Sequence, residues 1–248
     1  MRPIHVLRAL GVVLNTLVFG LIVILVCLFE RDGKLGYRVA KLWIAINLWL
    51  SGVRLKARGL ENLDPSRSYV FMSNHRSNTD IVALGWALWD YQLRWVAKKE
   101  LLKVPVFGWG LKALKNIIID RTNHAEAVRT YAEAGERMRR GISVIVFPEG
   151  TRGIGDELLP FKKGGFVLAI ETGTPIVPIG IVGTAAVLPR DGWQIESGDV
   201  EVRIGKPIET ANLTVKDRDQ LVARVREEIH KLMNGATLDA APRAAGGP

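Results

Sequence analysis

Short apolar runs recur along the chain from about residue 54 onward, and polar or glycine-containing segments separate them. Runs of this length that are rich in valine and isoleucine predict strands buried in a sheet. The predicted strands cover residues 54–60, 69–72, 93–97, 116–121, 143–147, 175–179 and 200–204. Two prolines within 175–179 predict either an edge strand or a strand start at that position.

Segments with a helical pattern lie between most of these runs. They cover residues 81–89, 123–140, 161–172 and 214–235. Asn123 and Thr214 are each followed three residues later by an acidic side chain, which is the spacing of an N-terminal capping box. From Leu221 to Leu232 the last helix carries one apolar stripe. Strands that alternate with helices predict an α/β fold with a largely parallel central sheet flanked by helices.

The N-terminal part of the chain has a different pattern. The run from Ala9 to Phe29 contains no charged residue and would be about 31 Å long as a helix, enough to cross the hydrocarbon core of a bilayer. A second apolar segment, Val39 to Val53, carries Trp43 and Trp49 but is too short to span a membrane upright. We interpret the pair as a membrane-embedded helical hairpin with its tryptophans at the interface.

Two other interpretations of this segment compete with the hairpin. Arg2 and Arg8 resemble the basic region of a signal peptide, but no small-residue cleavage site follows Phe29. The two segments could also be buried helices of a soluble core, although the first has no polar face. We therefore expect an anchoring hairpin over 1–53, a second domain over 54–235 and a disordered tail over 236–248.

The formal net charge of +9 is concentrated in the N-terminal part of the chain. Residues 1–60 carry nine Lys and Arg side chains against two acids, which leaves only +2 for the rest. A nucleic-acid-binding protein would instead spread its basic side chains over a folded face. Basic residues that flank apolar sequence suit an anionic membrane surface, so we expect membrane lipids and no nucleic acid as partners.

Composition and motifs also limit the chemistry. The chain has four histidines and one cysteine, Cys27, which lies inside the most apolar run. A metal site and a thiol nucleophile are therefore not expected. The sequence contains neither the G-x-S-x-G turn of serine hydrolases nor the G-x-x-x-x-G-K-[ST] loop that binds phosphate in nucleoside triphosphatases.

A histidine and an aspartate follow the predicted strand 69–72. His75 lies in the turn after this strand, and Asp80 lies at the start of the next helix, three residues after Ser77. On a straight helix, positions five apart diverge by roughly 140°, so the turn is needed to bring Asp80 to a ring nitrogen of His75. The carboxylate would then fix the tautomer and leave the other nitrogen free to accept a proton. Alternatively, Asp80 only complements the helix dipole.

Charged groups follow two further predicted strands. Asp120 and Arg121 end the strand 116–121, and Glu149, Thr151 and Arg152 follow the strand 143–147. Each group alone is typical of a solvated strand end. Together they would place cations and hydroxyls around one imidazole, and arginine is suited to binding a phosphate through two hydrogen bonds. The expected substrate carries a phosphate and a proton that a base can remove.

With these motifs in order, the chain resembles the glycerolipid acyltransferases, and most of all the 1-acyl-sn-glycerol-3-phosphate (lysophosphatidate) acyltransferases. The resemblance covers roughly residues 70–182. The four motifs are Asn74-His75-(four residues)-Asp80, Ile118-Ile119-Asp120-Arg121, Phe147-Pro148-Glu149-Gly150-Thr151-Arg152 and Ile176-Val177-Pro178-Ile179. Three positions differ from the family pattern: Lys115 replaces a frequent glycine, Ile118 a frequent aromatic residue, and Gly153 the usual serine.

The resemblance implies an enzyme of phospholipid biosynthesis that transfers a fatty acyl group to the sn-2 hydroxyl of lysophosphatidic acid and gives phosphatidic acid. It implies that His75 is the general base and that Asp80 orients it, without a cofactor or an acyl-enzyme. The donor would be a thioester of coenzyme A or of acyl carrier protein. The residues implied to bind substrate are Lys98, Arg121, Glu149, Gly150, Thr151 and Arg152.

The resemblance further implies a catalytic domain over 54–235 at the cytoplasmic face of the cell inner membrane, held there by residues 1–53. Other acceptors stay open, namely glycerol 3-phosphate, another lysophospholipid or a lyso-ornithine lipid. A membrane-anchored lipid-binding protein without activity is the non-enzyme alternative, although lipid binding alone requires no base.

Overall fold

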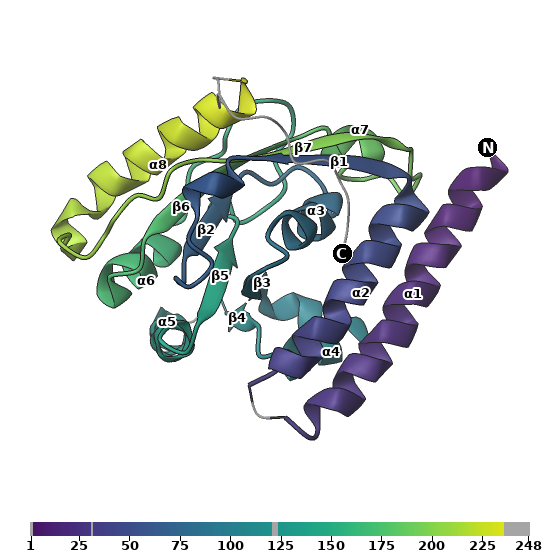
Figure 1. Cartoon of the computed structure of the whole chain (residues 1–248), viewed down its shortest axis with the longest axis horizontal. Helices are drawn as coiled ribbons and strands as arrows, with labels where there is room; N and C mark the ends of the chain where they lie inside the picture. Colours follow the sequence, from purple (N-terminus) through teal and green to yellow (C-terminus); the bar gives the residue numbers. More distant parts are fainter. Residues whose placement is uncertain (1, 31, 121–123, 236–248) are drawn as a thin grey trace.

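A computed structural model describes residues 2–30, 32–120 and 124–235. The predicted tail, 236–248, lies outside the described residues. Within the described residues the structure has one mixed sheet flanked by helices (Figure 1). Its strands are β1 (Val53–Arg58), β2 (Val70–Ser73), β3 (Gln92–Lys98), β4 (Ile117–Ile119), β5 (Ile142–Val146), β6 (Ile176–Val182) and β7 (Gly198–Ile204). Its α-helices are α1 (Pro3–Cys27), α2 (Lys34–Ser51), α3 (Thr79–Ala87), α4 (Phe107–Ala113), α5 (His124–Met138), α6 (Gly164–Thr172), α7 (Thr184–Val187) and α8 (Arg218–Met233).

The strand order in the sheet is β1-β7-β6-β2-β5-β3-β4. Every neighbouring pair is parallel except β6 and β7, so the predicted largely parallel sheet is confirmed. Of the two expectations for the proline-containing strand, the edge position is wrong, because β6 lies between β7 and β2. The strand start is confirmed for Pro175, which directly precedes the first residue of β6. Pro178 lies one residue beyond the end of the β6–β7 pairing, which starts at Ile179 and Ile204. Its carbonyl accepts from Gly205 N–H, just beyond β7 (2.9 Å).

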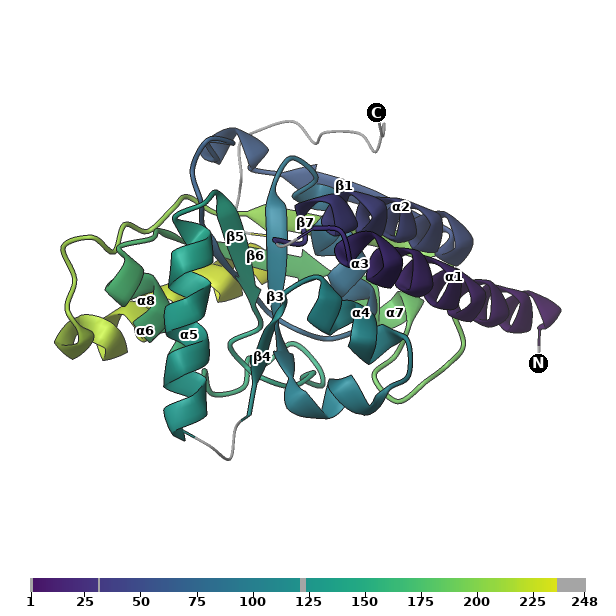
Figure 2. The same ribbon diagram turned by 90° about the horizontal axis from the view of Figure 1, so that it is seen from below.

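Alternate residues of the central strands enter two separate cores. Phe71 of β2 and Ile145 of β5 point toward α2 and α3, whereas Val70 and Val144 point toward α5, α6 and α8. The three-layer arrangement is plain in Figure 2, where α5, α6 and α8 lie on one side of the sheet. The predicted capping box at Thr214 is confirmed. It caps the N-terminus of the short 3-10 helix η3 (Val215–Asp217), which leads into α8.

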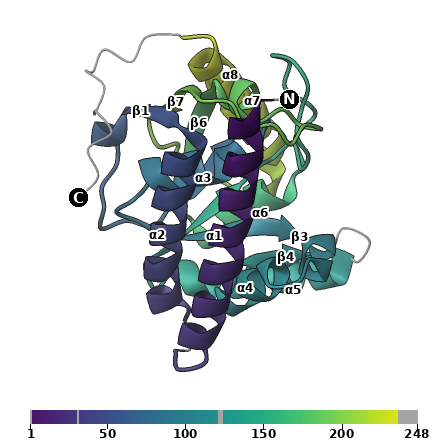
Figure 3. The same ribbon diagram turned by 90° about the vertical axis from the view of Figure 1, so that its right-hand side faces the viewer.

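The two N-terminal helices form the expected hairpin, but they differ in burial. Helix α2 buries Tyr37, Ile44 and Leu48 in the core beneath β1 and β7. Helix α1 packs on the outside of α2 and leaves a broad apolar face exposed (Figure 3). It is long and apolar enough to cross a membrane, which indicates membrane association. Helix α2 and the strands that follow the predicted boundary at residue 53 therefore share one hydrophobic core.

The two tryptophans of α2 have different environments. Trp49 is 78% exposed, as expected of an interfacial side chain. The indole of Trp43 instead donates to the Thr16 hydroxyl of α1 (3.1 Å) and is half-buried, so it packs between the two helices. Burial of the indole between two helices satisfies its only donor without water.

A buried arginine holds the turn of the hairpin against the sheet. Arg94 of β3 is 1% exposed, and its guanidinium donates to the carbonyls of Asp32 (2.7 Å) and Leu93 (2.8 Å). Its Cζ lies 5.6 Å from the centre of the Tyr37 ring. Desolvation lowers the pKa of Arg94 to about 10. The hairpin is therefore fastened to the α/β domain by polar contacts as well as by apolar packing.

Candidate active site

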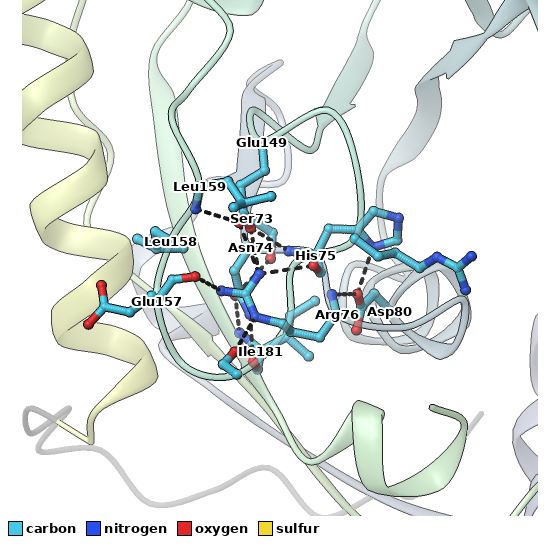
Figure 4. A network of polar contacts seen from close by, with 12 residues as sticks. Ser73, Asn74, His75, Arg76, Asp80, Glu149, Glu157, Leu158, Leu159 and Ile181 are labelled. Carbon is cyan, nitrogen blue, oxygen red and sulfur yellow. Dashed lines mark hydrogen bonds and ion pairs between the residues drawn. The ribbon is translucent and has the colours of Figure 1, made fainter. Parts of the chain in front are cut away.

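His75 and Asp80 form the hydrogen-bonded pair that the sequence predicts. His75 Nδ1 lies 2.7 Å from Asp80 Oδ2 (Figure 4). The same carboxylate oxygen accepts the backbone N–H groups of Arg76 (2.7 Å) and Ser77 (2.9 Å). A carboxylate can only accept, so Nδ1 carries the ring proton and Nε2 keeps its lone pair. Asp80 is fully buried, whereas 14% of the His75 side chain is exposed, so only the imidazole is accessible.

The turn that carries His75 is fixed from three directions. The Asn74 side chain forms two hydrogen bonds with the backbone of Ile181 in β6. Its Nδ2 donates to the Ile181 carbonyl (2.9 Å), and its Oδ1 accepts from the Ile181 N–H (2.8 Å). The imidazole stacks on the Phe147 ring, with centroids 3.9 Å apart and planes 10° from parallel. The carbonyl of His75 accepts the N–H of Gly153 (2.8 Å). The ring is thus held in one orientation before any substrate binds.

A second ion pair lies directly behind this turn. Glu149 and Arg76 are both buried, and Arg76 Nη1 donates to Glu149 Oε1 (2.8 Å) and Oε2 (3.0 Å). Glu149 Oε1 also accepts the backbone N–H of His75 (3.0 Å), and Oε2 that of Leu159 (2.9 Å). Arg76 continues into the loop after β5 by donating to the Gly155 carbonyl (2.8 Å). Figure 4 shows this network, which joins the ends of β2 and β5.

The position of Gly153 explains one difference from the motif pattern noted above. A Cβ atom at this position would collide with Arg76 Nη1 and would lie 2.9 Å from Arg76 Cζ, closer than real Cβ atoms approach their neighbours. It would also lie 3.1 Å from Glu149 Oε2, which is a tight contact. The Arg76 guanidinium fills the space that a serine side chain would need. The glycine at 153 is therefore coupled to the buried Arg76–Glu149 pair.

The accessible side of His75 faces one cavity of about 410 Å³. Its polar end contains the predicted residues Lys98, Gly150, Thr151 and Arg152. Its other end is apolar and lies between α1, α2 and α4. The apolar lining there includes Phe19, Val23, Ala40, Ile44, Phe107 and Leu111. The arrangement offers a base beside cationic groups, with an adjoining space that suits a hydrocarbon chain.

The comparisons with known proteins agree with this geometry. The family model described as acyltransferase matches residues 54–182. A 1-acyl-sn-glycerol-3-phosphate acyltransferase of Pseudomonas aeruginosa is 36% identical over 172 residues, covering 67% of this chain and 65% of that protein. The human α enzyme of the same name is 31% identical over 214 residues, covering 86% and 75%. The chain belongs to the acyltransferase family.

One solved structure of this acyltransferase family extends the similarity to the N-terminal hairpin. The crystal structure of a 1-acyl-sn-glycerophosphate acyltransferase from Thermotoga maritima has a TM-score of 0.75 and 25% identity. The match covers 96% of this chain and 98% of that one. A chloroplastic 1-acyl-sn-glycerol-3-phosphate acyltransferase of Brassica napus is 35% identical over 212 residues, but the match covers only 59% of its length.

The structure separates the predicted acyltransferase site residues into three groups. His75, Lys98, Gly150, Thr151 and Arg152 line one cavity. Asp80 and Glu149 lie buried behind it and do not line it. Arg121 lies outside the described residues. The site residues that follow different strands meet because of the topology. Strands β2, β5, β3 and β4 are neighbouring and parallel, so their carboxyl ends share one edge of the sheet.

Sequence reasoning missed three residues of this site. Arg76 lies inside the first acyltransferase motif but was not singled out, and Phe147 was given as a strand end and as the first residue of the third motif, without a role beside the base. Arg190 lines the cavity from the loop after α7, eight positions beyond the end of β6. An arginine in a loop after a short helix has no local signal that distinguishes it from a solvated surface residue.

Proposed function

We propose that this protein transfers a fatty acyl group from an acyl thioester to the sn-2 hydroxyl of 1-acyl-sn-glycerol 3-phosphate, and so makes phosphatidic acid. The observation that carries the proposal is the His75–Asp80 bond of 2.7 Å, which orients His75 in a cavity lined by both basic and apolar residues. A lipid-binding protein without activity would not require an oriented base. The acceptor named for the relatives is adopted here because both ends of the cavity suit it.

In the proposed reaction, His75 Nε2 removes the proton from the acceptor hydroxyl as its oxygen attacks the thioester carbonyl carbon. Asp80 holds the Nδ1 proton and stabilises the imidazolium that forms. The tetrahedral intermediate then expels the thiolate as the carbon–sulfur bond breaks. His75 returns its proton to the sulfur, so the products are an ester and a free thiol. The step uses no cofactor; the thioester of coenzyme A or of acyl carrier protein is a co-substrate.

The remaining residues divide between contact with substrate and support of the base. Lys98, Gly150, Thr151 and Arg152 line the polar end and would bind the acceptor's phosphoglycerol group, together with Arg121. The family motif implies the same role for Glu149, but its carboxylate is enclosed by Arg76 and backbone donors. We therefore propose that Glu149 positions His75 and does not touch the substrate.

The protein is proposed to act at the cytoplasmic face of the cell inner membrane, with α1 and α2 in one leaflet. The lyso-acceptor resides in the bilayer, whereas the thioester donor is made in the cytosol, and a site at this surface meets both. The apolar end of the cavity is bounded by α1, so an acyl chain can pass from lipid into the site beside that helix.

The function is tested with purified protein and a panel of lyso-acceptors. Acyl transfer would be measured with 1-oleoyl lysophosphatidate, glycerol 3-phosphate, lysophosphatidylethanolamine and a lyso-ornithine lipid, each with acyl-CoA and with acyl carrier protein. We expect the highest kcat/KM with lysophosphatidate and none above background with the His75→Ala variant. A higher kcat/KM with lyso-ornithine lipid, which lacks a phosphate, would refute the proposed acceptor.

A further inference from the structure

The loop between α7 and β7, residues 188–197, joins the active site to the first turns of α1. The Ser77 hydroxyl, in the turn after His75, donates to the Leu188 carbonyl at one end of the loop (2.7 Å). At the other end, the buried Ile195 carbonyl accepts from Arg8 Nη1 (3.2 Å) and lies 3.1 Å from His5 Nδ1. The loop is therefore held at both ends by contacts that do not involve its own exposed side chains.

Two arginines meet where this loop passes the cavity. Arg152 Nη1 donates to the carbonyl of Arg190 (2.6 Å), and Arg190 Nη1 donates to the carbonyl of Arg152 (2.8 Å). Both residues line the cavity that His75 lines. Through these reciprocal bonds each guanidinium reaches the backbone of the other arginine, and one nitrogen of each is used. Their remaining N–H donors are available to a third partner.

Little negative charge near this pair compensates the two positive charges. Within residues 2–30, 32–120 and 124–235, the carboxylate of Asp191 is the only one within 4 Å of Arg190, and none lies that close to Arg152. The Asp191 contact is long, 3.8 Å, and 85% of that side chain is exposed, so water screens it. Two arginines that line the same cavity create a strong preference for an anion with several acceptor oxygens.

We propose that Arg190 binds the phosphate of the acceptor together with Arg152, as the second half of a two-arginine clamp. The inference rests on the proposed function and adds a residue that no motif contains. In 1-acyl-sn-glycerol 3-phosphate the reacting hydroxyl and the phosphate ester are on neighbouring carbons. In the donor thioester the nearest phosphate lies at the far end of the pantetheine arm. A phosphate site beside His75 therefore suits the acceptor.

The chain connects the clamp tightly to the base. The residue after Arg152, Gly153, donates its N–H to the His75 carbonyl, and Leu188, two residues before Arg190, accepts from Ser77. Each arginine is thus within two residues of a direct bond to the turn that carries the base. A phosphate held by both would fix the glycerol backbone relative to His75, which is a requirement of direct acyl transfer.

The test compares an acceptor with a phosphate to one without. Steady-state kinetics and equilibrium binding would be measured for 1-oleoyl lysophosphatidate and for 1-oleoylglycerol in the same detergent micelles. We expect Arg190→Ala to raise the KM and Kd for lysophosphatidate about 10- to 150-fold, as expected for the loss of a charge-assisted hydrogen bond. The Kd for 1-oleoylglycerol and the KM for the acyl donor should stay unchanged. Arg190→Lys, which keeps the charge but loses the planar fork, should give an intermediate value.

Arg67→Ala is the matched control, because Arg67 forms an exposed ion pair with Glu209 beside the opposite ends of the strands. An Arg190→Ala variant with the lysophosphatidate Kd of the control would overturn the clamp and leave the proposed function standing. An equal rise in the KM for donor and for acceptor would also overturn the clamp, because it would indicate that the loop 188–197 is displaced. A wild-type protein that binds lysophosphatidate through Arg190 but does not acylate it would instead overturn the proposed function and leave the clamp.

Discussion

Removal of the Glu149 carboxylate should lower the stability of the fold more than it weakens substrate binding. The side chain is fully buried and accepts hydrogen bonds from Arg76, from His75 N–H and from Leu159 N–H. Glu149→Ala leaves the Arg76 charge buried without its partner and leaves two backbone donors without an acceptor. Removing one partner of a buried ion pair lowers the free energy of unfolding by about 3–5 kcal/mol. Glu149→Gln keeps one acceptor oxygen, so its cost should be smaller, about 1–3 kcal/mol.

Denaturant unfolding of the purified protein in detergent micelles, followed by tryptophan fluorescence, measures this effect. A double-mutant cycle with Arg76→Met isolates the pair itself. Once both charges are absent, neither is buried alone, so the combined variant should lose about 2 kcal/mol less than the sum of the single losses. In the surviving folded fraction kcat should fall more than the acceptor KM rises, because Glu149 holds the backbone of His75 and not the acceptor.

The opposite pattern would refute this reasoning. If Glu149→Ala unfolds at the same denaturant concentration as the wild type while the lysophosphatidate KM rises, the carboxylate contacts substrate directly. The role that the family motif implies would then be right, and the buried pair would have to open during the reaction. A zero coupling energy with Arg76→Met would independently contradict the structural role, because it would show that the two charges do not interact.

Three other outcomes are expected. His75→Ala should lower kcat about 10²- to 10⁴-fold with little change in the free energy of unfolding. Asp80→Asn should lose most activity because an amide can support the wrong tautomer of His75. Near-wild-type rates for either variant would contradict the assignment of His75 as the base. Gly153→Ser should lower the free energy of unfolding by about 1–3 kcal/mol because it overlaps the Arg76 guanidinium, and an unchanged denaturation midpoint would show that the guanidinium moves freely. A Phe29→Cys substitution in a Cys27→Ser background should not react with an impermeant thiol reagent on intact cells, and labelling from outside would show that α1 crosses the membrane.

The secondary structure was largely predictable because most elements have strong local patterns. All seven strands lie within a few residues of their predicted positions, since each is a short apolar run bounded by turns. Helix α4 (Phe107–Ala113) was missed because its segment begins after Pro105 and contains two glycines, which lower helix propensity. Its stability comes from packing against α1, a contact that no local pattern encodes.

The site was only partly predictable, for a related reason. His75 and Asp80 are five positions apart, so a turn and a cap were enough to predict their contact. Arg76 and Glu149 are distant in sequence and meet only because β2 and β5 are neighbours in the sheet. Arg190 reaches the cavity through a loop whose position depends on α1 and on Ser77. Contacts that depend on long-range topology leave no periodic signal in the chain.

The contacts of α1 with the rest of the protein determine how it can meet a membrane. His5 and Arg8, in its first turns, bond to the loop before β7. About 22 Å further along the helix, Gly20 packs against Val106, where a side chain on Gly20 would collide with Val106 Cγ1 (2.7 Å). Val106 precedes α4, an element of the α/β domain. The helix therefore lies alongside the domain from its first turn to its fifth (Figure 3).

A helix held in this way cannot cross a bilayer upright without carrying α4 and the active site into the hydrocarbon layer. It can lie along one leaflet with its exposed face in lipid, and that face includes Leu7, Leu14, Leu21 and Leu25. In this orientation the opposite side of α1 lines the apolar end of the cavity through Phe19 and Val23. One helix then separates the bilayer from the site by its own thickness. Under the proposed function, an acyl chain would move around this helix, from lipid to His75, without passing through water.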